Sequence, residues 1–361
     1  MAGLSRSKEE WAGLADAVVR DVAARELAFG ARELEAKAAD RKWGDFPTIQ
    51  PHLLTPAAAR LRREGVISYE GATTRGGGMQ RVFVTADPSK TAVRVAGRKR
   101  LLLARYRTWA TAGRDWNPSP VGSALERVIH ASLLETAPYG YRLLNPSGGE
   151  VKDLLGSRVP GGPLDSAAWL LRLDANGMPM QPVLIMIEAK NLREWIYPRT
   201  QELYQLLDKA ASVQVAHPNV SLVPVLVCRR LNYITGAMAK QIGMHLIETK
   251  TQFVRPVVLG VDDGQRKVDE VINELGYDVT LHDDATPAMK RQFETTLPSR
   301  VDEAAERWRL VSLHPEVPDV LSLLRDEEVL GDERTRARDD FARCVREATG
   351  EETVWASADL D

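Results

Sequence analysis

Residues 163–191 read PLDSAAWLLRLDANGMPMQPVLIMIEAKN. Two largely apolar runs flank Asn176-Gly177, and an Asn-Gly pair is the strongest short-range signal for a tight β-hairpin turn. With that pair at the tip, Asp165 lies opposite Glu188, and Lys190 shares a strand face with Glu188. Two carboxylates and an amine therefore meet at the open end of an apolar hairpin. Unpaired buried charge is costly, so this cluster indicates a site for a divalent metal.

Two prolines, Pro179 and Pro182, weaken this register, because proline cannot donate to a strand ladder and favours a bulge or a wider loop. A slip of one residue would separate Asp165 from the other two charges. Two simpler alternatives stay open: the Glu-x-Lys pair is a solvated strand face, or Asp165 is a turn residue after two glycines. The unbroken apolar run 184–187 directly before the charges favours a functional role.

The flanking segments predict an α/β fold in which helices lie on both sides of a sheet. The order is α-β-β-β-α-β followed by α-β, and its βαβ unit is expected to be right-handed. The apolar run at 222–228 is typical of a strand buried on both faces. The predicted elements are a helix at 123–136, a strand at 141–144, the hairpin, a helix at 198–216, a strand at 222–228, a helix at 234–244 and a strand at 245–248.

This order, together with Pro163-Leu164-Asp165 and Ile187-Glu188-Ala189-Lys190, resembles the PD-(D/E)xK nuclease superfamily. The resemblance covers residues 121–250, and its one departure is the extra Leu164 between the proline and the aspartate. It implies a restriction-endonuclease-like fold, a mixed sheet flanked by helices. It also implies an enzyme, a metal-dependent deoxyribonuclease that hydrolyses phosphodiester bonds.

The same resemblance implies a role for each residue that matches the motif. Asp165, Glu188 and the backbone carbonyl of Ala189 would bind Mg²⁺, for which Mn²⁺ would substitute. Lys190 would orient or deprotonate the attacking water and stabilise negative charge in the transition state.

Three further residues on the flanking helices are candidates for the same site. Glu126, at the edge of the apolar stripe of the first helix, would be a catalytic carboxylate that binds a second metal or acts through water. The alternative is that Glu126 pairs with Arg127 or His130 on a wet helix surface. Gln201 and Gln205, one turn apart on the helix after the hairpin, would be accessory residues.

Charge is distributed unevenly along a chain whose net charge is only −2. Residues 55–112 hold twelve Lys or Arg against three acidic residues, whereas residues 313–361 hold six Arg against fourteen acidic residues. A basic block of this kind is expected in proteins that bind the phosphate backbone of nucleic acids. The acidic end would repel DNA, and it would pack on the basic face or mask it until the substrate competes.

The basic block also resembles a winged helix-turn-helix. Thr55 is a good N-cap and Pro56 suits the first helical position, which predicts a helix ending at Gly65. Two short strands with a glycine-rich tip at 71–79 follow, and 11–37 supplies earlier helices. The candidate DNA-binding residues are Arg60, Arg62, Arg63, Arg75 and Arg81. The alternatives are a dimerisation or protein-docking module and a loose hairpin.

We expect four consecutive parts: a winged-helix-like DNA-binding domain at 1–90, a basic connector helix and linker at 91–120, a nuclease core at 121–283 and an acidic helical extension at 284–361. For the connector, a solvated helix with core-facing leucines is an equal alternative to a role at the DNA backbone. The helices expected after residue 255 span 265–275, 287–308, 315–329 and 332–349.

Composition narrows the classes of protein to which this chain could belong. In 361 residues, 44% are hydrophobic and 27% charged, as in ordinary globular proteins. No apolar run approaches the ~20 residues that span a bilayer, and the N-terminus lacks a signal-peptide core. The two cysteines exclude a disulfide framework, and a phosphate-binding Gly-x-x-x-x-Gly-Lys-Ser/Thr loop is absent. We therefore expect a cytoplasmic protein that uses no nucleotide cofactor and does not contact membranes.

The sequence thus predicts a Mg²⁺-dependent DNA endonuclease that acts in restriction or defence against foreign DNA. Cutting both strands requires two active sites, so we expect a homodimer. Two alternatives stay open: a DNA-binding protein whose nuclease-like core is an inactive scaffold, and a repair or junction nuclease that recognises DNA structure.

Overall fold

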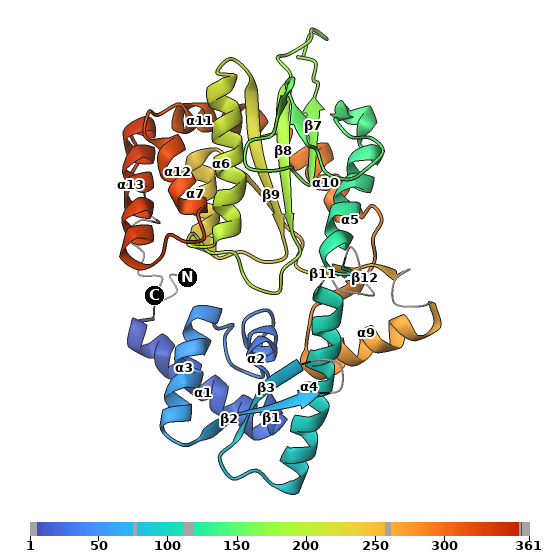
Figure 1. The fold of residues 1–361 in the computed structure, drawn as a ribbon, viewed down its shortest axis with the longest axis vertical. Helices are drawn as coiled ribbons and strands as arrows, with labels where there is room; N and C mark the ends of the chain where they lie inside the picture. Colours follow the sequence, from blue (N-terminus) through green and yellow to red (C-terminus); the bar gives the residue numbers. More distant parts are fainter. Residues whose placement is uncertain (1–5, 75–77, 112–118, 257–260, 354, 356–361) are drawn as a thin grey trace. The chain divides into compact units, whose positions relative to one another are not determined.

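The computed structural model describes residues 6–353 and 355, except for 75–77, 112–118 and 257–260. The chain forms two units (Figure 1). The N-terminal unit comprises residues 1–122 and 253–281, and the sheet unit comprises residues 123–252 and 282–359. The sequence predicted consecutive parts with a core at 121–283. The structure differs because 253–281 folds with the N-terminal unit and the C-terminal helices fold with the sheet unit.

Helices, a small three-stranded antiparallel sheet and a separate pair of short strands make up the N-terminal unit. The sheet has the strand order β1-β3-β2, and β2 pairs with β3 along its full length, from Ile67 opposite Thr85 to Thr74 opposite Gly78. The elements are α1 (Lys8–Glu26), β1 (Ala28–Phe29), α2 (Ala31–Ala38), α3 (Pro51–Arg63), β2 (Ile67–Thr74), β3 (Gly78–Thr85), α4 (Lys90–Ala110), β11 (Gln252–Val254), α9 (Val261–Leu275) and β12 (Val279–Leu281).

Helix α3 begins earlier than the sequence predicted. Its N-cap is Gln50 in extended conformation, and Pro51 occupies the first turn, where its missing N–H is not needed. Thr55 is therefore not a cap, and Pro56 lies inside the helix. The predicted start was wrong because the helix could begin at either of two prolines, Pro51 or Pro56. Leu54 is buried, so the turn that begins at Pro51 packs into the core and is part of the helix.

Helix α4 packs against α9, which explains why segment 253–281 belongs to the N-terminal unit. Leu102 and Trp109 on α4 share one buried cluster with Val271 on α9. Arg98 on α4 forms an ion pair with Glu274 on α9 at 2.7 Å. These contacts join elements that are far apart in sequence, and they neutralise part of the basic connector helix.

The sheet unit confirms the predicted α/β class. Its five-stranded mixed sheet has the order β10-β9-β8-β7-β4, with β8, β9 and β10 parallel and β4, β7 and β8 antiparallel. Strand β9 is buried at every residue after its first, which requires cover on both faces. The elements up to β10 are α5 (Gly122–Glu135), η1 (Ala137–Tyr139), β4 (Tyr141–Leu143), β5 (Asp153–Leu154), β6 (Ser157–Arg158), β7 (Ser166–Leu170), β8 (Val183–Lys190), α6 (Gln201–Ala216), β9 (Ser221–Cys228), α7 (Tyr233–Ile242) and β10 (His245–Glu248).

The predicted hairpin register is confirmed between β7 and β8. Ser166 lies opposite Ile187 and Leu170 lies opposite Val183, so the same register extended by one residue places Asp165 opposite Glu188. The tip differs from a two-residue turn. The carboxylate of Asp174 accepts hydrogen bonds from two backbone amides of a wider loop. The wider loop therefore leaves the strand register intact.

The C-terminal helices complete the sheet unit. They are α10 (Pro287–Arg291), the π-helical turn η2 (Gln292–Thr296), α11 (Val301–Ser312), α12 (Val317–Arg325) and α13 (Gly331–Thr349). The single helix predicted at 287–308 is interrupted, because Pro298 lacks the N–H that would continue it. Helix α12 packs on α6, and α11 packs on β9 (Figure 1). None of the described helices is both long and apolar enough to cross a bilayer.

The end of α7 provides a test of this packing. Gly243 has a φ of +78°, and a Cβ there would collide with the Ala304 carbonyl oxygen and the Trp308 amide nitrogen. Both atoms belong to the backbone of α11. We therefore expect Gly243→Ala to lower the free energy of unfolding of the sheet unit by about 2 kcal/mol or more, measured by chemical denaturation.

Gly236 in the same helix is the matched control. A Cβ added at Gly236 would meet Leu231 Cδ1 as its nearest neighbour at 3.7 Å, which is an ordinary contact. Gly236→Ala should therefore retain stability or raise it by up to about 1 kcal/mol, through helix propensity. Equal stability of the two variants would contradict the packing described here.

Candidate active site

The β7–β8 register brings three predicted residues together at the end of the hairpin. The Ala189 amide donates a hydrogen bond of 2.6 Å to Asp165 Oδ2, which ties the bend before β7 to the end of β8. Lys190 Nζ lies 3.1 Å from Glu188 Oε1. Glu188 is only 5% exposed, whereas Asp165 and Lys190 are half-buried. The Glu-x-Lys pair is therefore not a solvated strand face.

Helix α6 supplies two more polar side chains to this cluster. Gln205 Oε1 accepts a hydrogen bond of 3.4 Å from Lys190 Nζ. Gln205 was predicted to face this site. Lys209 Nζ lies 3.3 Å from Glu188 Oε2 and donates a 2.6 Å hydrogen bond to the Pro163 carbonyl. Both oxygens of Glu188 therefore contact an ammonium group.

Lys209 was missed by the sequence analysis. Its signal was its position: it lies three residues after Leu206 and directly before Ala210, within the apolar stripe that faces the sheet. A lysine in such a stripe needs a buried acceptor, and Glu188 and the Pro163 carbonyl supply two.

Gln201 is one turn before Gln205 but has a different partner. Its side-chain amide donates a 2.8 Å hydrogen bond to the Arg325 carbonyl at the end of α12. The Arg325 guanidinium in turn contacts Asp208 Oδ2 at 2.7 Å and also binds the Gly161 carbonyl. The loop before Asp165 is thus held from the C-terminal helices, and Gln201 takes part in that contact.

The carboxylates influence one another electrostatically. Burial, and then the negative charge of Glu188, raise the pKa of Asp165 to about 7, although the hydrogen bond from the Ala189 amide acts in the opposite direction. Burial, followed by the charges of Glu150 and Glu188, also raises the pKa of Glu126. Glu126 therefore lies within electrostatic range of Glu188. Its neighbour Arg127 pairs with Asp283 at 2.9 Å, so the predicted alternative of a Glu126–Arg127 pair is not seen.

Oxygen donors in this cluster are of the type that Mg²⁺ prefers. Asp165, Glu188 and the Ala189 carbonyl lie on adjacent positions of the hairpin, as the metal-site prediction requires. Among the described residues, however, no three His, Cys, Asp or Glu side chains are already grouped as metal ligands. The structure instead places the ammonium groups of Lys190 and Lys209 against Glu188.

The predicted DNA-binding arginines fall into three groups. Arg60 forms an ion pair with Asp16 on α1 at 2.8 Å, so it links α3 to α1. Arg62 and Arg63, at the end of α3, are exposed, as is Arg81 on β3. Arg75 lies outside the described residues.

No known protein family, curated protein or solved structure matches this chain. Its function is therefore inferred from its own residues and their geometry.

The raised pKa of Asp165 gives a pH-dependent stability. Unfolded Asp has a pKa near 4, so the folded state favours the protonated form, and this contribution to stability is lost as the pH rises from about 4 to 7. We expect Asp165→Asn, which can still accept the Ala189 hydrogen bond, to be more stable than the wild type at pH 8. The advantage should disappear near pH 4. Thermal unfolding in EDTA across this range measures it.

Asp302 provides a control of opposite sign. The hydrogen bond from Arg172 lowers the pKa of Asp302, so Asp302→Asn should destabilise the protein at pH 8 and have a smaller effect at low pH. A stability difference between Asp165→Asn and the wild type that does not change with pH would contradict the coupling of the carboxylates.

Proposed function

We propose that this chain is a Mg²⁺-dependent endonuclease of the PD-(D/E)xK type that hydrolyses DNA phosphodiester bonds. The observation that carries the proposal is the β7–β8 register, which holds Asp165 beside the Glu188-Ala189-Lys190 segment. Two carboxylates on adjacent strand positions, with a lysine 3.1 Å from one of them, provide the oxygen ligands and the cation that metal-assisted hydrolysis uses.

Asp165, Glu188 and the Ala189 carbonyl would hold the metal. Bound there, Mg²⁺ would polarise the phosphate and lower the pKa of a water molecule. Lys190 and Lys209 both contact Glu188 in the structure, so metal binding requires at least one ammonium group to move away. We expect Lys190 to be the one that moves, since Lys209 is also held by the Pro163 carbonyl.

The remaining steps follow from the chain's own side chains. Attack of a water oxygen on phosphorus forms one P–O bond and breaks the bond to the leaving sugar oxygen, which takes up a proton from solvent. Lys190, once displaced from Glu188, orients that water and stabilises negative charge on the phosphorus centre. Glu126, whose pKa is raised by burial and by the charges of Glu150 and Glu188, is the carboxylate suited to accept the proton of the water.

The N-terminal unit is proposed to be a winged-helix DNA reader. Its order of helix, strand, two helices and a hairpin, with β1 added beside β3, supports this proposal. Arg62, Arg63 and Arg81 are exposed and suited to phosphate contacts, whereas Arg60 has a structural partner in Asp16. A reader joined to a cutter favours restriction or defence against foreign DNA, and cleavage of both strands favours a homodimer.

A second candidate function is a DNA-binding protein with an inactive nuclease-like scaffold. The observation in its favour is that Lys190 and Lys209 already neutralise Glu188 on both oxygens. In a scaffold these ion pairs would be permanent, because breaking a buried pair leaves an uncompensated charge.

Cleavage of supercoiled DNA with Mg²⁺, Mn²⁺ or EDTA tests the nuclease. We expect cutting with either metal and none in EDTA. Lys190→Ala should reduce the rate by about a hundredfold or more, because it removes the charge that stabilises the transition state. Lys290→Ala is the matched control, since that lysine pairs with Glu135 at the far end of α5 and should retain full activity.

Intact DNA under every condition, with binding that Lys190→Ala leaves unchanged, would exclude the nuclease and favour the scaffold. Linear, branched and single-stranded substrates in the same assay separate a sequence-directed enzyme from a structure-specific one.

DNA binding by the N-terminal unit is tested with a double variant, Arg62→Gln with Arg63→Gln. Loss of two phosphate contacts should weaken binding at all sequences and reduce the slope of log affinity against log salt by up to about 2. Arg98→Gln is the control, because Arg98 pairs with Glu274 and is not expected to contact phosphate. An unchanged salt slope in the double variant would contradict the proposed reader surface.

A further inference from the structure

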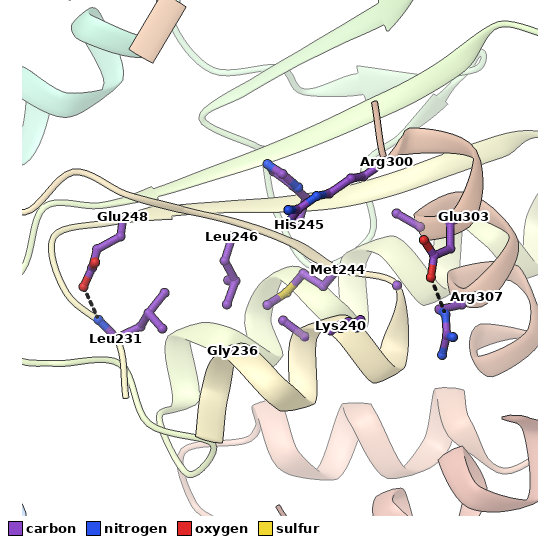
Figure 2. A pocket seen from close by; sticks show the side chains of 13 residues that line it. Leu231, Gly236, Lys240, Met244, His245, Leu246, Glu248, Arg300, Glu303 and Arg307 are labelled. Carbon is purple, nitrogen blue, oxygen red and sulfur yellow. Dashed lines mark hydrogen bonds and ion pairs between the residues drawn. The ribbon is translucent and has the colours of Figure 1, made fainter. Parts of the chain in front are cut away.

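A cavity of about 560 Å³ opens beside β10, the edge strand of the large sheet (Figure 2). Its walls are β10, one face of α7 and the first two turns of α11. Small residues leave room for the cavity: Gly236 and Ala239 on α7, Gly243 at the C-cap of α7 and Ala304 on α11 line it. Its volume lies in the range of small-molecule sites.

Two cations on the wall are available to a ligand. Lys240 on α7 and Arg300 at the start of α11 are exposed, and within the described part of the chain neither forms an ion pair. The third cation, Arg307, is already paired with Glu351 at 2.9 Å and with Glu303, a carboxylate on the same wall, at 3.4 Å. The positive end of the α11 dipole lies at Arg300, which adds to the attraction for an anion.

A buried imidazole lies beside the same wall. His245 is 7% exposed, its Nε2 atom has no hydrogen-bond partner, and Figure 2 shows the Arg300 side chain against it. Burial, together with the charge of Arg300, lowers the pKa of His245 to about 4. The ring is therefore neutral at physiological pH and retains one N–H donor and one acceptor.

The rest of the lining is suited to the uncharged part of a ligand. Leu231, Met244 and Leu246, labelled in Figure 2, provide apolar surface. Glu248 uses Oε1 to accept a hydrogen bond of 3.4 Å from the Leu231 amide, which leaves Oε2 to accept one from a ligand hydroxyl. Cations, an apolar wall and a hydroxyl acceptor together match a phosphorylated sugar that carries an apolar group.

We propose that this cavity binds a small phosphate monoester of the size of a nucleoside monophosphate. The phosphate dianion lies between Lys240 and Arg300, beside the neutral His245 ring, and the sugar hydroxyls face Glu248. A monocarboxylate matches less well, because two unpaired cations favour a doubly charged group. The cavity uses none of the residues Asp165, Glu188, Lys190 and Lys209, so this proposal can be tested independently of the proposed nuclease activity.

Isothermal titration of the full-length protein tests the proposal, with adenosine 5′-monophosphate, ribose 5-phosphate, adenosine and inorganic phosphate as probes. We expect adenosine 5′-monophosphate to bind and adenosine to fail. Arg300→Gln should weaken binding about tenfold or more, because a charge-assisted hydrogen bond is lost. Gly236→Leu should block the cavity without removing any charge, and Lys290→Gln is the control for an exposed lysine elsewhere in the sheet unit.

Equal binding of ribose 5-phosphate supports the proposal and assigns recognition to the sugar and phosphate. Three results would overturn it. The first is that neither ester binds up to about 1 mM. The second is that both Arg300→Gln and Gly236→Leu bind adenosine 5′-monophosphate as tightly as the wild type, and the third is that inorganic phosphate binds equally well to the wild type and to every variant. Gly236→Ala, which fits the helix and adds little volume, shows whether a loss in Gly236→Leu comes from blocking or from misfolding.

Discussion

The alignment of β7 with β8 is the constraint on which the candidate site depends. Side chains alternate along a strand, so a slip of one residue would move Glu188 and Lys190 to the face opposite Asp165. Five backbone pairs from Ser166–Ile187 to Leu170–Val183 set the register, and the Ala189 amide extends it by binding the Asp165 carboxylate. The apolar residues of β8 stabilise this alignment, because a slip would also remove their side chains from the core.

Charge compensation around Glu188 is the second requirement. A carboxylate that is 5% exposed needs partners, and Lys190 and Lys209 supply them from β8 and α6. Lys209 also binds the Pro163 carbonyl, and its neighbour Asp208 holds Arg325, which binds the Gly161 carbonyl. One turn of α6 therefore positions the segment 161–163 that leads to Asp165. This is how the C-terminal helices contribute to the geometry of the site.

In the N-terminal unit the basic block has two kinds of cation. Arg60, Arg98 and Lys99 have acidic partners inside the unit and contribute to its packing. Arg62 and Arg63 remain exposed at the end of α3. A count of charges along the chain therefore overstates the surface available to DNA, because it does not distinguish paired from unpaired cations.

Local patterns in the sequence determined the hairpin, its register and the alternation of helices and strands, because turn residues and apolar periodicity act between near neighbours. They placed Asp165 beside Glu188 and Lys190 correctly, and Gln205 on the same side. A local signal was also missed at Pro298, which interrupts the helix predicted at 287–308.

Contacts between distant segments decided the rest. Four such contacts join residues separated by 21 to 176 positions in the sequence. They are the pairs Lys209–Glu188, Arg60–Asp16 and Gln201–Arg325, and the packing of α9 on α4. Each depends on which surfaces meet when the helices and strands pack. A side chain's partner across such a distance is set by the free energy of the whole assembly and leaves no periodic pattern in the sequence.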